Sequence, residues 1–212
     1  MGRVPGFASI ALSFTPWIVY WSVTPFIGAP AIWASLAITA LVLTLNRLIL
    51  GEAAFMDAFT AAFMAAASIG VAAGVEVFIW GRGFIGYSAL AVMALTSLAL
   101  RRPYTLQVSK LDYPDVYWSQ PAFIKTNEVI TWAWVCVYAV AAVTSVVLAP
   151  PASSLAPLAF IGLGLWLSTW IPKTYPLREV VREFPRYGYW RAGVGGGRGE
   201  GYDVGVVGSG VG

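Results

Sequence analysis

Six long apolar stretches, separated by short polar or proline-containing connections, account for most of this 212-residue chain. They cover residues 7–26, 31–50, 55–75, 84–100, 129–148 and 155–171. A helix needs roughly 20 apolar residues to cross the hydrocarbon core of a bilayer, so each stretch is long enough, or nearly so, for one crossing. We therefore expect an all-α fold, a polytopic membrane helix bundle with six transmembrane helices.

The composition excludes an ordinary soluble globule. Hydrophobic residues make up 58% of the chain and charged residues 11%, whereas soluble domains usually carry roughly 25% charged residues. That leaves too little polar surface to cover a folded chain of this length in water. The lipid bilayer is therefore the first expected partner.

The basic residues are distributed unevenly between the two sides of these stretches. If the stretches alternate in direction, Arg82 is the only one of the 13 Lys and Arg residues on its side. The other side carries Arg3, Arg47, Arg101, Arg102, Lys110, Lys125, Lys173, Arg178, Arg182, Arg186, Arg191 and Arg198. Cytoplasmic loops carry the Lys and Arg excess, so we expect a multi-pass protein of the plasma membrane with both termini in the cytoplasm. Because these residues follow topology and form no solvated stripe, nucleic-acid binding is not expected.

Two segments on the basic side are expected at the membrane interface. Residues 101–128 are polar and rich in aromatic side chains, and residues 173–191 alternate apolar and charged positions at helical spacing, as in an amphipathic interfacial segment. Amphipathic rings accumulate at headgroup level, where we also expect Trp17. Contacts to anionic headgroups are expected from the basic members of the set Arg101, Arg102, Tyr117, Trp118, Arg178 and Arg182.

The chain is expected to have four parts. Residues 1–172 form the six-helix transmembrane domain, 173–191 the interfacial segment, 192–201 a glycine-rich linker, and 202–212 a distinct end. Within the third apolar stretch, Gly70 and Gly74 have the small-xxx-small spacing that lets helix backbones approach closely in lipid. They are expected to pack helices within the chain, with oligomerisation as the alternative.

Residues able to carry chemistry are few. The chain has no His, and Cys136 is its only cysteine, expected as a small core residue. The charges next to the apolar stretches, including Asp57, fall near expected helix ends, which disfavours a small transporter. Asn127 and Glu128 are explained as capping residues at the start of the fifth helix. No active site and no metal site is expected in these residues.

Residues 202–212 resemble the opening strand and glycine turn of an FAD-binding or NAD-binding Rossmann unit. Gly208 and Gly210 match the first two glycines of the G-x-G-x-x-G pattern, and the third would follow residue 212. The resemblance implies cofactor contacts at these glycines only if the chain continues into such a domain, with FAD bound in the longer product and none in this chain. The alternative is a disordered glycine-rich tail.

Residues 10–171 resemble the intracellular septation protein A family. The resemblance is carried by Arg101-Arg102-Pro103 with Leu106-Gln107, by Val116-Tyr117-Trp118-Ser119 and by Trp132-Ala133-Trp134. It implies an inner-membrane protein connected with maintenance of the cell envelope, without an established catalytic site. The basic segment and the glycine-rich extension depart from that family.

Two functional classes therefore remain. The first is a non-catalytic integral membrane protein of the cell envelope, similar to the septation proteins. The second is the N-terminal membrane anchor of a flavin-dependent oxidoreductase that acts on a lipid-soluble substrate and carries a cytoplasmic oxidoreductase domain.

Overall fold

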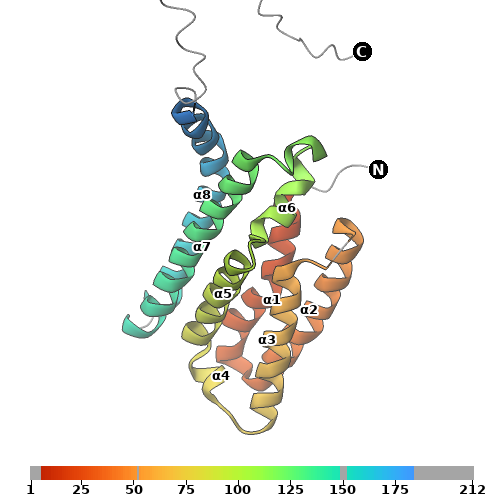
Figure 1. Ribbon diagram of the computed structural model, residues 1–212. Helices are drawn as coiled ribbons and strands as arrows, with labels where there is room; N and C mark the ends of the chain where they lie inside the picture. Colours follow the sequence, from red (N-terminus) through yellow and green to blue (C-terminus); the bar gives the residue numbers. More distant parts are fainter. Residues whose placement is uncertain (1–5, 52, 149–151, 184–212) are drawn as a thin grey trace, which may run out of the picture. The chain divides into compact units, whose positions relative to one another are not determined.

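The computed structural model describes residues 6–51, 53–148 and 152–183, and these residues form helices and turns, with no strand among them. The elements are α1 (Gly6–Ile27), α2 (Ala29–Leu50), α3 (Phe55–Ala72), α4 (Val77–Trp80), α5 (Arg82–Ala99), α6 (Tyr104–Asp112), the 3-10 helix η1 (Asp115–Tyr117), α7 (Pro121–Val147) and α8 (Ala152–Glu183) (Figure 1). The expected all-α class is confirmed for this part of the chain.

The chain divides into two units, Met1–Pro176 and Leu177–Gly212. The second unit contributes only the last turns of α8 to the described residues. The fold and the site below concern the first unit.

Five helices are long and apolar enough to cross a membrane. Their candidate spans are Ser9–Ile27, Ala29–Leu48, Phe55–Ala72, Arg82–Ala99 and Pro121–Val147. The sixth expected crossing, residues 155–171, lies within α8, where the side chains of residues 152–158 are outside the described set. A bundle of membrane-crossing length is thus present, and the sixth crossing stays a prediction.

The bundle is apolar outside and partly polar inside. Large apolar side chains are exposed on the five candidate spans, among them Ile18, Trp33, Leu41, Leu48, Ile69, Val92, Trp132, Val143 and Val146. Buried polar side chains include Ser9, Ser13, Ser35, Thr39, Asn46, Asp57, Thr60, Asn127 and Thr131. Cys136, expected in the core, is instead exposed on α7. This distribution reverses that of a water-soluble helix, which places its apolar stripe inward.

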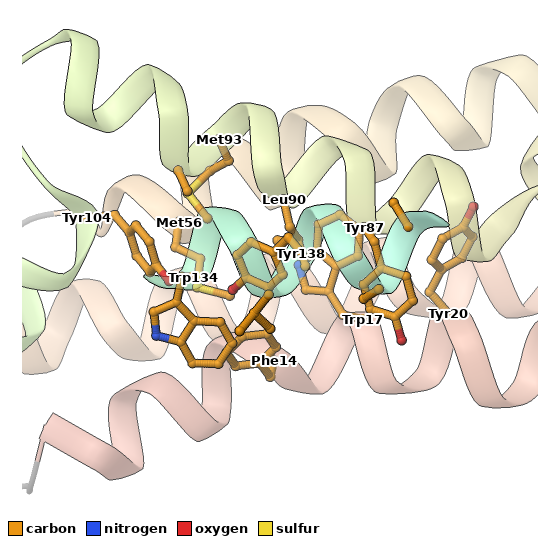
Figure 2. Packing of buried hydrophobic residues seen from close by; sticks show 14 of the residues in the cluster. Phe14, Trp17, Tyr20, Met56, Tyr87, Leu90, Met93, Tyr104, Trp134 and Tyr138 are labelled. Carbon is orange, nitrogen blue, oxygen red and sulfur yellow. The ribbon is translucent and has the colours of Figure 1, made fainter. Parts of the chain in front are cut away.

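Helix α1 forms the centre of the packing, because it contacts α2, α3, α4, α5 and α6. Its Trp17 has no exposed surface and stacks on Phe63 of α3 at a centroid distance of 4.9 Å. Its Phe14 lies 5.7 Å from the ring of Trp134 on α7, and Figure 2 shows the side chains of Phe14, Trp134 and Tyr138 next to one another. The interfacial position expected for Trp17 is therefore wrong: its ring fills the interior, where aromatic pairs add about 0.5–1.5 kcal/mol beyond burial.

Short connections define the two ends of this unit, with α4 at one end and α6 at the other (Figure 1). At the α6 end, α2 stops at Gly51, whose φ of 75° is left-handed and whose N–H bonds to the carbonyl of Arg47. The opposite turn between α1 and α2 uses Gly28, with φ 65° and a proline in the first turn of α2. A left-handed residue favours glycine because a Cβ would clash there.

Helix α7 begins earlier than its apolar content predicts. It starts at Pro121 after the extended residue Gln120, whereas the apolar stretch starts at residue 129. Asn127 consequently lies inside the helix and is buried, so its interpretation as a capping residue is wrong. Proline suits a helix start because it lacks the N–H that would have no partner there.

Candidate functional site

The strongest candidate site is a buried polar centre formed by Ser9, Ser13, Asn46 and Asp57. These four side chains come from α1, α2 and α3, and each has at most 4% of its surface exposed. Asn46 Nδ2 donates to Asp57 Oδ2 over 2.7 Å and to Ser13 Oγ over 3.0 Å. Ser9 Oγ donates to Asn46 Oδ1 over 3.0 Å. Asn46 therefore joins all three helices through one amide.

Asp57 is the charged group of this centre. It lies in the first turn of α3 and has 1% of its surface exposed. Its Oδ1 has no hydrogen-bond partner. Lys125 and Glu128 form an ion pair at the start of α7, and no ion pair joins Asp57 to a cation among the described residues. The partial positive charge of the α3 N-terminus favours an acid at this position but gives Oδ1 no donor.

Several hydroxyl groups farther along the bundle are hydrogen-bonded apart from this centre, whereas Thr24 Oγ1 and Ser68 Oγ are buried with no hydrogen-bond partner. Ser35 and Thr39 of α2 each donate to the carbonyl four residues earlier in their own helix. One turn beyond Asp57, Thr60 Oγ1 accepts a 3.0 Å hydrogen bond from Trp17 Nε1. The polar centre is thus a local hydrogen-bonded cluster at the α6 end.

Helix α6 is held against this end of the bundle. Gln107 Oε1 accepts from the backbone N–H of Phe55, the first residue of α3, over 2.7 Å. On its other side, Thr105 Oγ1 lies 2.9 Å from Thr131 Oγ1, and Ser109 Oγ donates to Asn127 Oδ1 over 2.7 Å. The connection expected as a polar interfacial loop is therefore partly a helix that is hydrogen-bonded to two of the candidate spans.

The centre can accommodate two protonation states of one acid. Ionised Asp57 only accepts hydrogen bonds, whereas the protonated acid also donates one. Asn46, Ser9 and Ser13 each carry both donors and acceptors, so they can partner either form. Among the described residues, no group of three or more His, Cys, Asp or Glu side chains is placed to hold a metal ion.

The residues expected at the interface lie at the α6 end or in α8. Arg101 and Arg102 are exposed just after α5, where their backbone N–H groups bond to the carbonyls of Leu98 and Ser97. Tyr117 and Trp118 are exposed, and Lys110 Nζ lies 5.2 Å from the centre of the Trp118 ring. Arg178 and Arg182 belong to the last turns of α8.

The two glycines expected in helix packing, Gly70 and Gly74, differ in their surroundings. A Cβ at Gly70 would lie 2.6 Å from Cε2 of Phe78, so the ring of Phe78 occupies the space beside this glycine. Gly74 lies beyond the end of α3 with φ 84°, and a Cβ added to it would meet no atom within 4 Å, so its role there is in the turn. Gly208 and Gly210 lie outside the described residues.

Sequence reasoning missed the polar centre. It placed Asp57 near a helix end, as the structure does, and assigned it no partner. The available signal was Asn46, one of only four Asn and Gln residues in the chain, close in sequence to Asp57 across a glycine turn. An amide within an apolar span finds a polar partner because lipid offers none.

Comparison with known protein families, with characterised proteins and with solved structures gives no match for this chain.

Proposed function

We propose that this chain is a non-catalytic, multi-pass integral membrane protein of the cell envelope, in the plasma membrane. The observation that supports the proposal is the apolar exterior of five helices of crossing length around an interior that holds Ser, Thr, Asn and Asp. In water such an exterior would leave large contiguous apolar patches exposed. In lipid the same surface needs no cover.

Six crossings and cytoplasmic termini complete the proposal. Five crossings would put the two termini on opposite sides, and a sixth crossing by α8 returns the C-terminus to the side of the N-terminus. The connections between α2 and α3 and between α5 and α7 then share that side with the basic C-terminal segment. This is the arrangement that the Lys and Arg excess favours, and it brings Arg101, Arg102, Arg178 and Arg182 to anionic headgroups.

A role in envelope maintenance, similar to that of the septation proteins, is the function we assign to this membrane domain. Its support is the resemblance over residues 10–171, including Arg101-Arg102-Pro103 and Trp132-Ala133-Trp134. In the structure, Arg101-Arg102-Pro103 directly precedes α6, and Trp132-Ala133-Trp134 lies within α7. Hydrogen bonds from Thr105 and Ser109 to Asn127 join these two helices. A partner protein in the envelope would meet this basic face.

Membrane extraction tests the insertion. Washing membranes that contain the full chain with alkaline carbonate or high salt should leave it in the pellet, and a mild detergent should release it. A peripheral protein held by its basic face would be released by salt, because that attraction is screened. Release by salt or carbonate would overturn the proposal.

The second candidate is the membrane anchor of a flavin-dependent oxidoreductase, and residues 202–212 favour it. Tyr202 and Asp203 precede an apolar run and the glycines Gly208 and Gly210, in the order in which a Rossmann strand opens. On this proposal an FAD-binding domain lies on the cytoplasmic side. Reading the gene past the codon for Gly212 tests it: an in-frame helix sequence with the third glycine supports the anchor, and a stop codon there contradicts it.

A further inference from the structure

We propose that Asp57 binds and releases a proton reversibly, and that the buried polar centre is built to hold both forms of its carboxyl group. The ligand is a proton, and the groups that accommodate it are Asn46, Ser9 and Ser13. One part of the inference, the side of the membrane from which the proton comes, rests on the proposed function.

Burial without a cation is the first step of the argument. Asp57 has 1% of its surface exposed, and its hydrogen-bond donor is the neutral amide of Asn46, which also bonds to the hydroxyl groups of Ser9 and Ser13. An isolated carboxylate taken out of water costs several kcal/mol even after the protein relaxes, and an acid in such a position neutralises instead. A permanently ionised Asp57 would require a counter-ion that the described neighbours do not supply.

The hydrogen-bond geometry gives the second step. With Asp57 ionised, Asn46 Nδ2 donates to Oδ2, as observed. With Asp57 protonated, a turn of the Asn46 amide brings its oxygen to the acid proton, and its NH2 group then faces Ser9 Oγ, which now accepts. The orientation of an amide follows from its hydrogen bonds, so this exchange needs rotation of small groups and no movement of a helix.

The unpartnered oxygen gives the third step. Asp57 Oδ1 is buried without a donor, whereas a site built to hold a carboxylate surrounds both oxygens with N–H or O–H groups. The deficit favours the neutral acid over the anion. It also disfavours a metal cation as occupant, because the NH2 group of Asn46 faces the carboxylate where a cation would require an oxygen.

Apart from the partial positive charge at the N-terminus of α3, the described charges nearest the centre belong to a few side chains on the neighbouring elements. The ionisable residue of α1 is Tyr20, whose hydroxyl donates to the carbonyl of Phe78 at the other end of the bundle, and Asp57 is the only charged residue of α3. The ionisable groups on the elements packed at this end are Arg47 of α2, Tyr104, Lys110 and Asp112 of α6, and Arg101 and Arg102 after α5. Arg47, Arg101 and Arg102 are exposed, and a charge in water acts weakly on a buried acid.

The proton would exchange with the cytoplasm. Asp57 is in the first turn of α3, at the end where Gln107 of α6 bonds to the backbone of Phe55. The proposed topology puts this end on the basic, cytoplasmic side.

Infrared spectroscopy of the full chain in lipid nanodiscs tests the proposal. The wild-type protein should show the C=O stretch of a buried carboxylic acid near neutral pH, and that band should give way reversibly to carboxylate bands as the pH is raised. Asp57→Asn should lose the band, and Asp115→Asn, a change at an exposed acid of η1, should retain it. Asn46→Leu removes a donor to the anion and should shift the conversion upward by about one pH unit.

Three results would overturn it. Carboxylate bands from Asp57 at every pH would mean a permanently ionised group, and an acid band that never converts would mean a purely structural acid. Carboxylate bands that depend on Na⁺ rather than on pH would mean a cation site. Size-exclusion chromatography of Asp57→Asn, which preserves shape, checks that the variant is folded, and none of these outcomes depends on the extraction test above.

Discussion

At the scale of single residues, Asn46 has the most demanding position, because its one amide bonds to Ser9, Ser13 and Asp57 on two other helices. Polar contacts of this kind inside membrane proteins contribute about 0.6 kcal/mol on average. Their larger effect is on specificity, since each group left alone in the interior loses a partner that lipid cannot replace. The centre therefore selects one register of α1, α2 and α3.

Removal of the carboxyl group should cost more than its neutralisation. We expect Asp57→Ala to lower the free energy of unfolding by about 1 kcal/mol or more, because Asn46 Nδ2 loses a buried acceptor. Asp57→Asn keeps the shape and should leave stability unchanged or raise it. Thermal unfolding in detergent measures both, with Asp115→Ala as the exposed control, expected within about 0.5 kcal/mol of wild type. Equal losses for the two Asp57 variants would contradict the expectation.

Trp17 and Cys136 show why the burial of individual side chains could not be predicted from the sequence. Both lie within apolar stretches, and the sequence alone does not say which side of a uniformly apolar helix faces lipid. Trp17 is fully buried and hydrogen-bonded to Thr60, whereas Cys136 is exposed. In lipid, outward and inward positions are equally apolar, so the pattern that separates them in a soluble helix is absent.

At the scale of elements, α7 connects the bundle to α8 through one large side chain. Trp134 of α7 is 2% exposed, and its Nε1 donates to Ser168 Oγ of α8 over 2.9 Å. Its ring packs against the backbone of α8 at Gly164, where a Cβ would lie 2.7 Å from Cζ3. The absence of a side chain at Gly164 lets the two helices approach.

A methyl group at that glycine should separate the two helices. We expect Gly164→Ala to lower the free energy of unfolding by about 1–3 kcal/mol through overpacking against the buried ring. Gly162→Ala is the matched control in the same helix, because its Cβ would have no atom within 4 Å. That change should be neutral or stabilising by up to about 1 kcal/mol, as alanine is the better helix former. The pair is compared by thermal unfolding, and identical behaviour would mean that α7 and α8 do not pack in this way.

The helices themselves were largely predictable, and their ends were not. The apolar stretches 31–50 and 84–100 correspond closely to α2 and α5. Helix α7, in contrast, extends back to Pro121 through polar residues. In this polar part of α7, Asn127 is hydrogen-bonded to α6. A hydropathy pattern does not detect such a contact between segments.

At the scale of the whole molecule, the distribution of basic residues between the two ends of the bundle predicts its orientation in the membrane. The connection at the α4 end carries Arg82 alone, whereas the α6 end carries several basic residues. Connections rich in Lys and Arg prefer the cytoplasmic side of the membrane, and this preference sets the orientation of the bundle. The α4 end should therefore face outward.

Cysteine labelling checks this expectation. In a Cys136→Ala background, Ala73→Cys lies exposed at the α4 end and Asp115→Cys lies exposed at the α6 end. A membrane-impermeant thiol reagent added to intact cells should label Ala73→Cys, and it should label Asp115→Cys only after permeabilisation. The reverse pattern would show the opposite orientation. Labelling of both positions in intact cells would contradict the crossing by α5 between them.

The sequence by itself determined the class of this protein: helices of crossing length follow from the length of the apolar runs, and the proposed orientation follows from the basic residues. Both properties are sums over many residues, so no single contact decides them. Only the tertiary structure decided that Asp57, Asn46, Ser9 and Ser13 meet away from water and that Trp17 lies in the core. The reason is that burial depends on which helix faces pack together, and in a chain whose inner and outer faces are both apolar, local sequence carries little of that information.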